Sequence, residues 1–215
     1  MQKWKKDPKL HSCKREEGKK KLDYYGTYVD EFLNADELRD WESFERCKKL
    51  WMFCDKHVGG FKEQCRVLDC GTKDGQFPEW LVQQGYDALG IDISKPYIEY
   101  ALSKDRPVMD VDVCNMHFYD NIFDIVFSHH LLGLTSDYRI AIREMFRVTS
   151  PNGYFISLND CPGNQKKHFH YISSSDDLKK EVSKCRGEVL YFDYFKNKKE
   201  FLIIIRKADF EWENI

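Results

Sequence analysis

The stretch from Arg66 to Ser94 constrains the fold of this chain more than any other. An apolar run ends in Asp69, glycines follow at Gly71 and Gly75, an amphipathic segment comes next, and a second apolar run ends in Asp92. Strand, tight turn, helix and strand in this order predict one βαβ unit. Glycines let the backbone turn sharply beside a ligand, and an acid at the tip of the second strand can accept hydrogen bonds from a ribose.

Composition limits the class of protein. The chain has 215 residues, which suits one domain with small additions, and its 42% hydrophobic residues are enough for a sizeable core. The net charge of −2 argues against a wholly basic nucleic-acid binder. The aromatic share of 15% favours a well-packed fold or a stacking site.

The cysteines and the apolar runs indicate the compartment. Eight cysteines are scattered without a C-x-x-C pair, so a zinc ribbon is not expected. The N-terminus is charged and has no apolar core of a secretory signal, and no apolar run reaches the length of a membrane span. We therefore expect a cytoplasmic protein with free thiols and no membrane partner.

The chain divides into three parts by composition. Residues 1–33 form a lysine-rich arm followed by an aromatic segment, residues 34–207 form the main domain, and residues 208–215 form a tail. The arm is either a solvated charge block or a contact for a phosphate-bearing or acidic partner. The tyrosines of the aromatic segment either cover a bound ligand or pack in the core.

Further elements follow from periodicity and from capping residues. Apolar spacing predicts a long helix over residues 35–57, with Asn34 as its N-cap and a glycine pair after it. Ser94 is expected to cap the next helix, and a short strand is expected near residues 108–111. A helix over about 175–184 and a hairpin of strands 188–195 and 201–206 are expected to close the chain.

Two later stretches extend the pattern of the first. Residues 112–128 read DVCNMHFYDNIFDIVFS, in which an acid leads into an apolar strand that ends at Ser128. Residues 147–157 read RVTSPNGYFIS, in which proline and Asn-Gly make a turn into a further strand.

Together these three stretches resemble the class I S-adenosylmethionine-dependent methyltransferases. The family pattern V-L-D-x-G-x-G-x-G aligns with Val67 to Gly75, where Lys73 stands at the middle glycine. The family patterns G-D-A-x-x-L-P-F-x-D-x-x-F-D-V-V-x-S and R-V-L-K-P-G-G align with the two later stretches. The resemblance implies an α/β fold, a Rossmann-like doubly wound seven-stranded sheet with a C-terminal antiparallel hairpin.

The resemblance also implies the cofactor, S-adenosyl-L-methionine, and the residues around it. It assigns the methionine end of the cofactor to the loop after the first strand, the ribose to the acid after the second, and the adenine to residues 93 and 112–114. A dinucleotide site would need G-x-G-x-x-G, which is absent, so an NAD-dependent oxidoreductase is disfavoured. The expected cofactor-binding residues are Asp69, Gly71, Gly75, Asp92, Ile93, Asp112, Val113, Cys114 and Ser128.

Three histidines are candidate catalytic residues. His129 and His130 follow the fourth strand, at the edge where open α/β sheets hold their ligands, and could take a proton. Family members often have a histidine a few residues later, where this chain has Gly133. His168 lies in a polar loop as half of an H-x-H pair, which lacks a second pair of metal ligands, so no metal is expected. Burial with a hydrogen bond, or simple solvation, is the competing explanation for each.

The expected function is methyl transfer to an unidentified acceptor, with an oxygen atom of a small molecule as the leading choice. The D/N-P-P-Y/F sequence of exocyclic-amine DNA methylases is absent, which disfavours DNA. The basic arm keeps an RNA or protein acceptor open. A methyltransferase-like interaction protein without catalysis is the alternative, favoured by Lys73 and Gly133. The sequence carries no signal for an oligomeric state.

Overall fold

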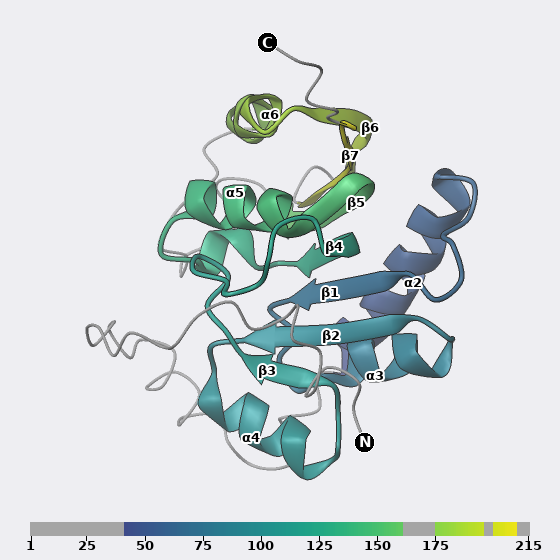
Figure 1. The fold of residues 1–215 in the computed structure, drawn as a ribbon, viewed down its shortest axis with the longest axis vertical. Helices are drawn as coiled ribbons and strands as arrows, with labels where there is room; N and C mark the ends of the chain where they lie inside the picture. The colour runs from purple at the N-terminus through teal and green to yellow at the C-terminus, as the bar shows by residue number, and fades with distance from the viewer. Residues whose placement is uncertain (1–40, 161–174, 196–199, 210–215) are drawn as a thin grey trace.

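The structure is a computed structural model, and it describes residues 41–160, 175–195 and 200–209 (Figure 1). The lysine-rich arm, the aromatic segment, the Asn34 cap, His168 and most of the tail lie outside the described residues. The predictions made for those parts of the chain therefore stay predictions.

A seven-stranded sheet with the order β3-β2-β1-β4-β5-β7-β6 forms the centre of the domain (Figure 1). Strands β1 to β5 pair in parallel, while β7 runs antiparallel between β5 and β6. This confirms the predicted fold, including its C-terminal hairpin. The strands are β1 (Arg66–Cys70), β2 (Asp87–Asp92), β3 (Val108–Asp110), β4 (Phe123–His129), β5 (Thr149–Asp160), β6 (Gly187–Phe195) and β7 (Glu200–Lys207).

Both faces of the sheet are covered by helices, because successive strand residues point to opposite faces. Leu68 packs in a cluster with α5 (Tyr138–Val148) and α6 (Ser175–Lys184). Its neighbour Val67 packs in the other cluster, with Trp51 of α2 (Trp41–His57) and Leu81 of α3 (Gln76–Gln83). The near-continuous apolar strands are therefore those of a parallel sheet buried on both sides.

Helix α4 (Lys95–Ser103) packs beside β2 and β3, and its cap differs from the prediction. The Ser94 hydroxyl makes no capping hydrogen bond. The Ser94 N–H donates instead to Oδ1 of Asp92, at 2.9 Å, so Ser94 supports the acid at the end of β2.

The turn expected at residues 151–153 lies inside β5, which already begins at Thr149. Thr149 pairs with Phe123, and the register between β4 and β5 then shifts before Ile125. Asn152 takes a left-handed backbone with φ of 59° at this irregularity. The turn residues therefore interrupt the pairing rather than precede the strand.

The carboxyl ends of β1, β2 and β4 meet at one edge of the sheet, because these strands run parallel. Open α/β sheets bind ligands at this edge. Within the part of the chain that the structure describes, no helix has both the length and the apolar character that crossing a membrane requires.

Candidate functional site

The loop that joins β1 to α3 keeps its left-handed turns although Lys73 replaces a glycine of the family pattern. Gly71, Lys73 and Gly75 have φ values of 78°, 54° and 75°. The Lys73 N–H donates to Oδ2 of Asp92, at 2.9 Å, which ties the loop to the end of β2. A lysine can adopt this backbone at a modest cost, since one left-handed residue costs about 1–2 kcal/mol.

A side chain at either glycine of this loop would meet a neighbouring side chain, closely at Gly75 and more loosely at Gly71. A Cβ built on Gly75 would lie 2.5 Å from Cγ1 of Val108, and one built on Gly71 would lie 2.9 Å from Cδ1 of Leu131. The predicted requirement for glycine therefore has two causes at each position, the positive φ and the packed neighbour.

Asp92, the last residue of β2, accepts hydrogen bonds from the two loops that lie beside it at this edge of the sheet. One of its oxygens accepts from the Lys73 N–H and the other accepts from the Ser94 N–H. Burial raises the pKa of Asp92, and the N–H donors of Ser94 and Lys73 oppose that rise. Each carboxylate oxygen can accept a further hydrogen bond, so Asp92 retains acceptor capacity for a diol.

Asp69, at the end region of β1, is almost completely buried, with 4% of its surface exposed. Burial raises the pKa of Asp69 from 3.8 to about 7, the Thr72 hydroxyl opposes this, and the charges of Asp92 and Asp74 add to it. Asp74 itself is paired with Arg106, at 3.0 Å. The edge thus gathers three carboxyl groups and one guanidinium around the glycine loop.

The raised pKa of Asp69 predicts that the free protein loses stability as the pH rises. The folded protein holds a proton that the unfolded chain releases above pH 3.8, so this contribution is fully present below that pH and is lost as the pH rises through about 7. The free energy of unfolding of the wild type should decrease between pH 5 and pH 8. In Asp69→Asn this decrease should be smaller by about 2–3 kcal/mol. Urea unfolding of both proteins at the two pH values measures this difference, and equal falls would contradict it.

The residues expected around the adenine lie after β2 and β3. Ile93 is 44% exposed, so its apolar side chain is accessible beside the end of β2. Oδ1 of Asp112 accepts from the Cys114 N–H, at 2.8 Å, which closes a turn. Val113 is buried and Cys114 is half-buried, so the side chain of Val113 offers little surface to a ligand. Their contact with the cofactor stays a prediction.

The Ser128 hydroxyl belongs to a buried polar network rather than to an open surface. It lies 2.7 Å from the Ser157 hydroxyl, which in turn accepts from Nδ2 of Asn159, also at 2.7 Å. All three side chains are buried. This network links β4 to β5 and uses the Ser128 hydroxyl, so the predicted place of Ser128 near the cofactor stays a prediction.

Ser128→Ala should therefore lower stability and leave the cofactor site unchanged. Loss of the hydroxyl leaves Ser157 without one partner, which should cost about 1–2 kcal/mol of the free energy of unfolding. Affinity for S-adenosylhomocysteine, measured by calorimetry, should stay within about twofold, which corresponds to less than 0.5 kcal/mol. A tenfold loss of affinity would place Ser128 at the ligand after all.

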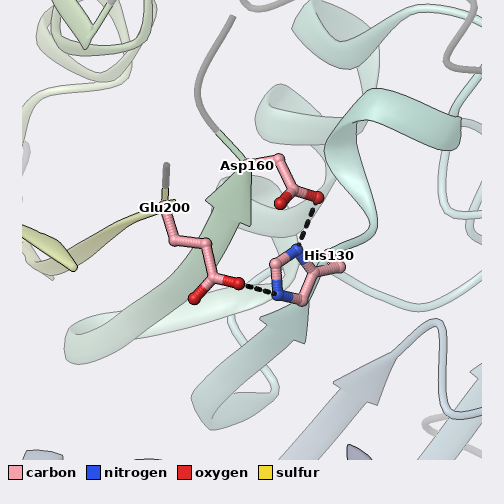
Figure 2. A group of neighbouring side chains, drawn as sticks. All are labelled: His130, Asp160 and Glu200. Carbon is pink, nitrogen blue, oxygen red and sulfur yellow. Dashed lines mark hydrogen bonds and ion pairs between the residues drawn. The ribbon is translucent and has the colours of Figure 1, made fainter. Parts of the chain in front are cut away.

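His129, the last residue of β4, and His130, the next residue, have different surroundings. Nδ1 of His129 lies 3.3 Å from the Ser43 hydroxyl of α2. Nδ1 of His130 lies 2.8 Å from Oδ2 of Asp160, and its Nε2 lies 3.6 Å from Oε1 of Glu200 (Figure 2). The structure thus joins His130 to the carboxylates that end β5 and begin β7. Sequence patterns gave no reason to connect Glu200 with His130, because the antiparallel register of β7 sets its position.

Glu200 also connects this edge to the N-terminal helix. Its Oε2 accepts from Nη2 of Arg46 in α2, at 2.7 Å, and its side chain is 7% exposed. A buried carboxylate needs such a partner, because transfer of an unpaired charge out of water is costly. Helix α2 is therefore fixed to the site by an ion pair as well as by apolar packing.

Residues 68–157 match a family model described as a methyltransferase domain. This part of the chain is therefore similar to a methyltransferase domain, in agreement with its resemblance to the class I S-adenosylmethionine-dependent methyltransferases. A curated relative, the demethylmenaquinone methyltransferase of Corynebacterium urealyticum, is 34% identical over 88 residues, which is 41% of this chain and 38% of that protein. The chain spans about half the length, or less, of the first curated relatives that it matches.

Solved structures agree with the methyltransferase fold. A methyltransferase from Aquifex aeolicus is similar with a TM-score of 0.62 and 18% identity, over 85% of this chain and 98% of that one. The [4+2]-cyclase SpnF is similar with a TM-score of 0.64 and 15% identity, over 76% of this chain and 81% of that one. At these identities the likeness shows the fold alone, and the cyclase illustrates that one fold hosts several reactions.

The cofactor of this family is S-adenosylmethionine, and the residues of the methyltransferase domain fit it. Asp92 retains acceptor capacity for a ribose, and the left-handed loop from Gly71 to Gly75 brings backbone close to the same edge. Ile93 offers an accessible apolar side chain for a flat ring beside Asp92.

Proposed function

We propose that this chain transfers a methyl group from S-adenosylmethionine to an oxygen atom of a small-molecule acceptor. The observation that carries the proposal is the pairing of Asp92 with the left-handed glycine loop inside a matched methyltransferase domain. The curated relatives named demethylmenaquinone methyltransferase support a small molecule rather than a macromolecule as the acceptor.

The residues of the loop would hold the cofactor at the ends of β1 and β2. Asp69, Gly71 and Gly75 would surround its methionine end, Asp92 would accept from the ribose, and Ile93 would cover the adenine. When bound, S-adenosylmethionine supplies a methyl group that is already activated by a positively charged sulfur. The bond from methyl carbon to sulfur breaks as the bond to the acceptor oxygen forms, sulfur keeps the electron pair, and the hydroxyl proton leaves to a base.

We place the acceptor at the ends of β4 and β5, beside His130. Strand β4 pairs directly with β1, so the end of β4 adjoins the proposed methionine end of the cofactor. Because the donor is already activated, the protein mainly has to position the acceptor oxygen. His130 is half-buried, and its Nδ1 lies 2.8 Å from Oδ2 of Asp160, so a carboxylate orients this imidazole at the end of β4.

A transfer assay with labelled donor tests this proposal. The full chain is incubated with methyl-labelled S-adenosylmethionine and, in separate reactions, a panel of phenols and quinols, a panel of amines and thiols, total RNA, and a protein extract. The expected result is label in hydroxylated small molecules, and Asp92→Asn should reduce it at least tenfold when the donor is well below saturation. Label only in RNA or protein would overturn the choice of acceptor. Binding of S-adenosylhomocysteine without transfer to any panel would favour an interaction protein.

A further inference from the structure

His130, Asp160 and Glu200 form a group of neighbouring side chains, here called the acid–histidine cluster (Figure 2). None of the three is among the residues expected to bind the cofactor. One nitrogen or oxygen atom from each of its three side chains lies within 4.8 Å of the others. The residues stand at the end of β4, the end of β5 and the start of β7, at the edge of the sheet that holds ligands. Imidazole and carboxylate groups are ligands for divalent transition metals.

Hydrogen bonding fixes how the imidazole of His130 is oriented. Its Nδ1 lies 2.8 Å from Oδ2 of Asp160, and a carboxylate accepts there, so Nδ1 carries a proton. In the neutral ring the lone pair is then on Nε2. This atom is buried and has no hydrogen-bond partner among the described residues. Histidines that bind metals commonly donate their other ring N–H to a carboxylate in this way.

Nε2 of His130 faces Oε1 of Glu200 across 3.6 Å. A ring nitrogen and a carboxylate oxygen that turn lone pairs toward each other repel unless a positive charge lies between them, either a proton or a metal ion. The distance is long for a hydrogen bond, whose donor and acceptor lie about 2.7–3.2 Å apart. Two ligands of a tetrahedral ion, each about 2.1 Å from it, lie about 3.4 Å apart. The separation therefore matches a shared ion more closely than a shared proton.

The strands hold the ligand positions in place. Asp160 and Glu200 are opposite each other in the β5–β7 register. The His130 N–H donates to the Leu158 carbonyl oxygen, at 2.8 Å, which continues the β4–β5 pairing. Rigid strands define the geometry of a metal site better than loops do.

We propose that His130 Nε2 and Glu200 Oε1 bind a divalent cation of the zinc, manganese or iron class, with Asp160 orienting the imidazole. Arg46 occupies the other oxygen of Glu200. Two protein ligands leave further positions of the ion open to water or to an acceptor oxygen. The charges of the ion, Arg46, Asp160 and Glu200 sum to plus one, which a deprotonated acceptor oxygen would balance. This use of the ion rests on the proposed function, whereas the binding of the ion does not.

A titration with Mn²⁺ tests the site without any cofactor. The full chain, freed of metal by chelation, is titrated with Mn²⁺ while electron paramagnetic resonance reports the free ion. We expect one tightly bound ion per chain, lost in His130→Asn and Glu200→Gln and weakened about 10–100-fold in Asp160→Asn. Asparagine suits position 130 because the backbone there is left-handed, with φ of 52°. His117→Asn, an exposed histidine elsewhere, is the control and should bind as the wild type does.

Two results would overturn the proposal: no bound Mn²⁺ at millimolar concentration, or equal binding by the wild type and His130→Asn. Either would leave a proton between His130 and Glu200. Circular dichroism checks that each variant folds, and if Glu200→Gln does not, His130→Asn alone decides. Because the titration contains no S-adenosylmethionine, its failure is separate from a failure of methyl transfer.

Discussion

Gly75→Ala is expected to lower the free energy of unfolding by about 2–4 kcal/mol, the sum of backbone strain and overpacking. The backbone at Gly75 is left-handed, with φ of 75°, and a Cβ there would lie 2.5 Å from Cγ1 of Val108. Val108 is itself buried between β2 and α4, so it has little room to move. The same change should weaken S-adenosylhomocysteine binding, because the loop must shift at the start of α3.

Gly85→Ala is the matched control for this prediction. Gly85 also has a left-handed backbone, with φ of 94°, but a Cβ there would meet nothing within 4 Å. It should therefore lose only about 1–2 kcal/mol, the cost of the backbone strain. Urea unfolding of both variants separates strain from overlap. If the two variants lose the same free energy of unfolding, the Val108 side chain can move aside, and the loop is less tightly packed than its geometry indicates.

Asp92→Asn is expected to weaken S-adenosylhomocysteine binding at least tenfold, which corresponds to about 1.4 kcal/mol or more. Both oxygens of Asp92 already accept from the N–H groups of Lys73 and Ser94. An amide has only one oxygen, so in either orientation its NH₂ group faces one of these donors. The loop would then move, and the acceptor capacity left for a ribose would fall.

Asp124→Asn is the control for Asp92→Asn. Its Oδ2 also accepts from a backbone N–H, that of Arg66, at 2.8 Å, but it lies at the opposite end of β1 and β4. Calorimetry should therefore give wild-type affinity for this variant. If Asp92→Asn binds as tightly as Asp124→Asn does, the proposed ribose site is in the wrong place.

Local patterns in the sequence predicted the glycine loop, and the resemblance to the methyltransferase family predicted the seven-stranded sheet. The loop depends on residues close together in the chain, from Val67 to Gly75, and on the acid that follows one helix later. Lys73 departs from the family pattern, yet the structure keeps the left-handed backbone there because its N–H donates to Asp92. The presence of Lys73 had favoured the alternative of an interaction protein without catalysis. The retained loop conformation weakens this argument.

Side-chain contacts between neighbouring strands could not be predicted from the sequence. Ser128 was predicted to lie near the cofactor by analogy, but the sequence did not show that the register of β4 and β5 pairs its hydroxyl with that of Ser157. The partners of His130 are set by the ends of β5 and β7, which are far apart in the chain. No periodicity or spacing encodes such long-range pairing, since it depends on strand order and on antiparallel register.

Calorimetric titration of the full chain with S-adenosylhomocysteine, with NAD as the control ligand, tests whether the chain has a site for S-adenosylmethionine. Binding of S-adenosylhomocysteine with a micromolar dissociation constant, about −8 kcal/mol, and no binding of NAD is the predicted result. It would establish the cofactor site and justify the search for an acceptor. Absence of binding by either ligand would contradict the account and make Lys73 the first residue to replace by glycine.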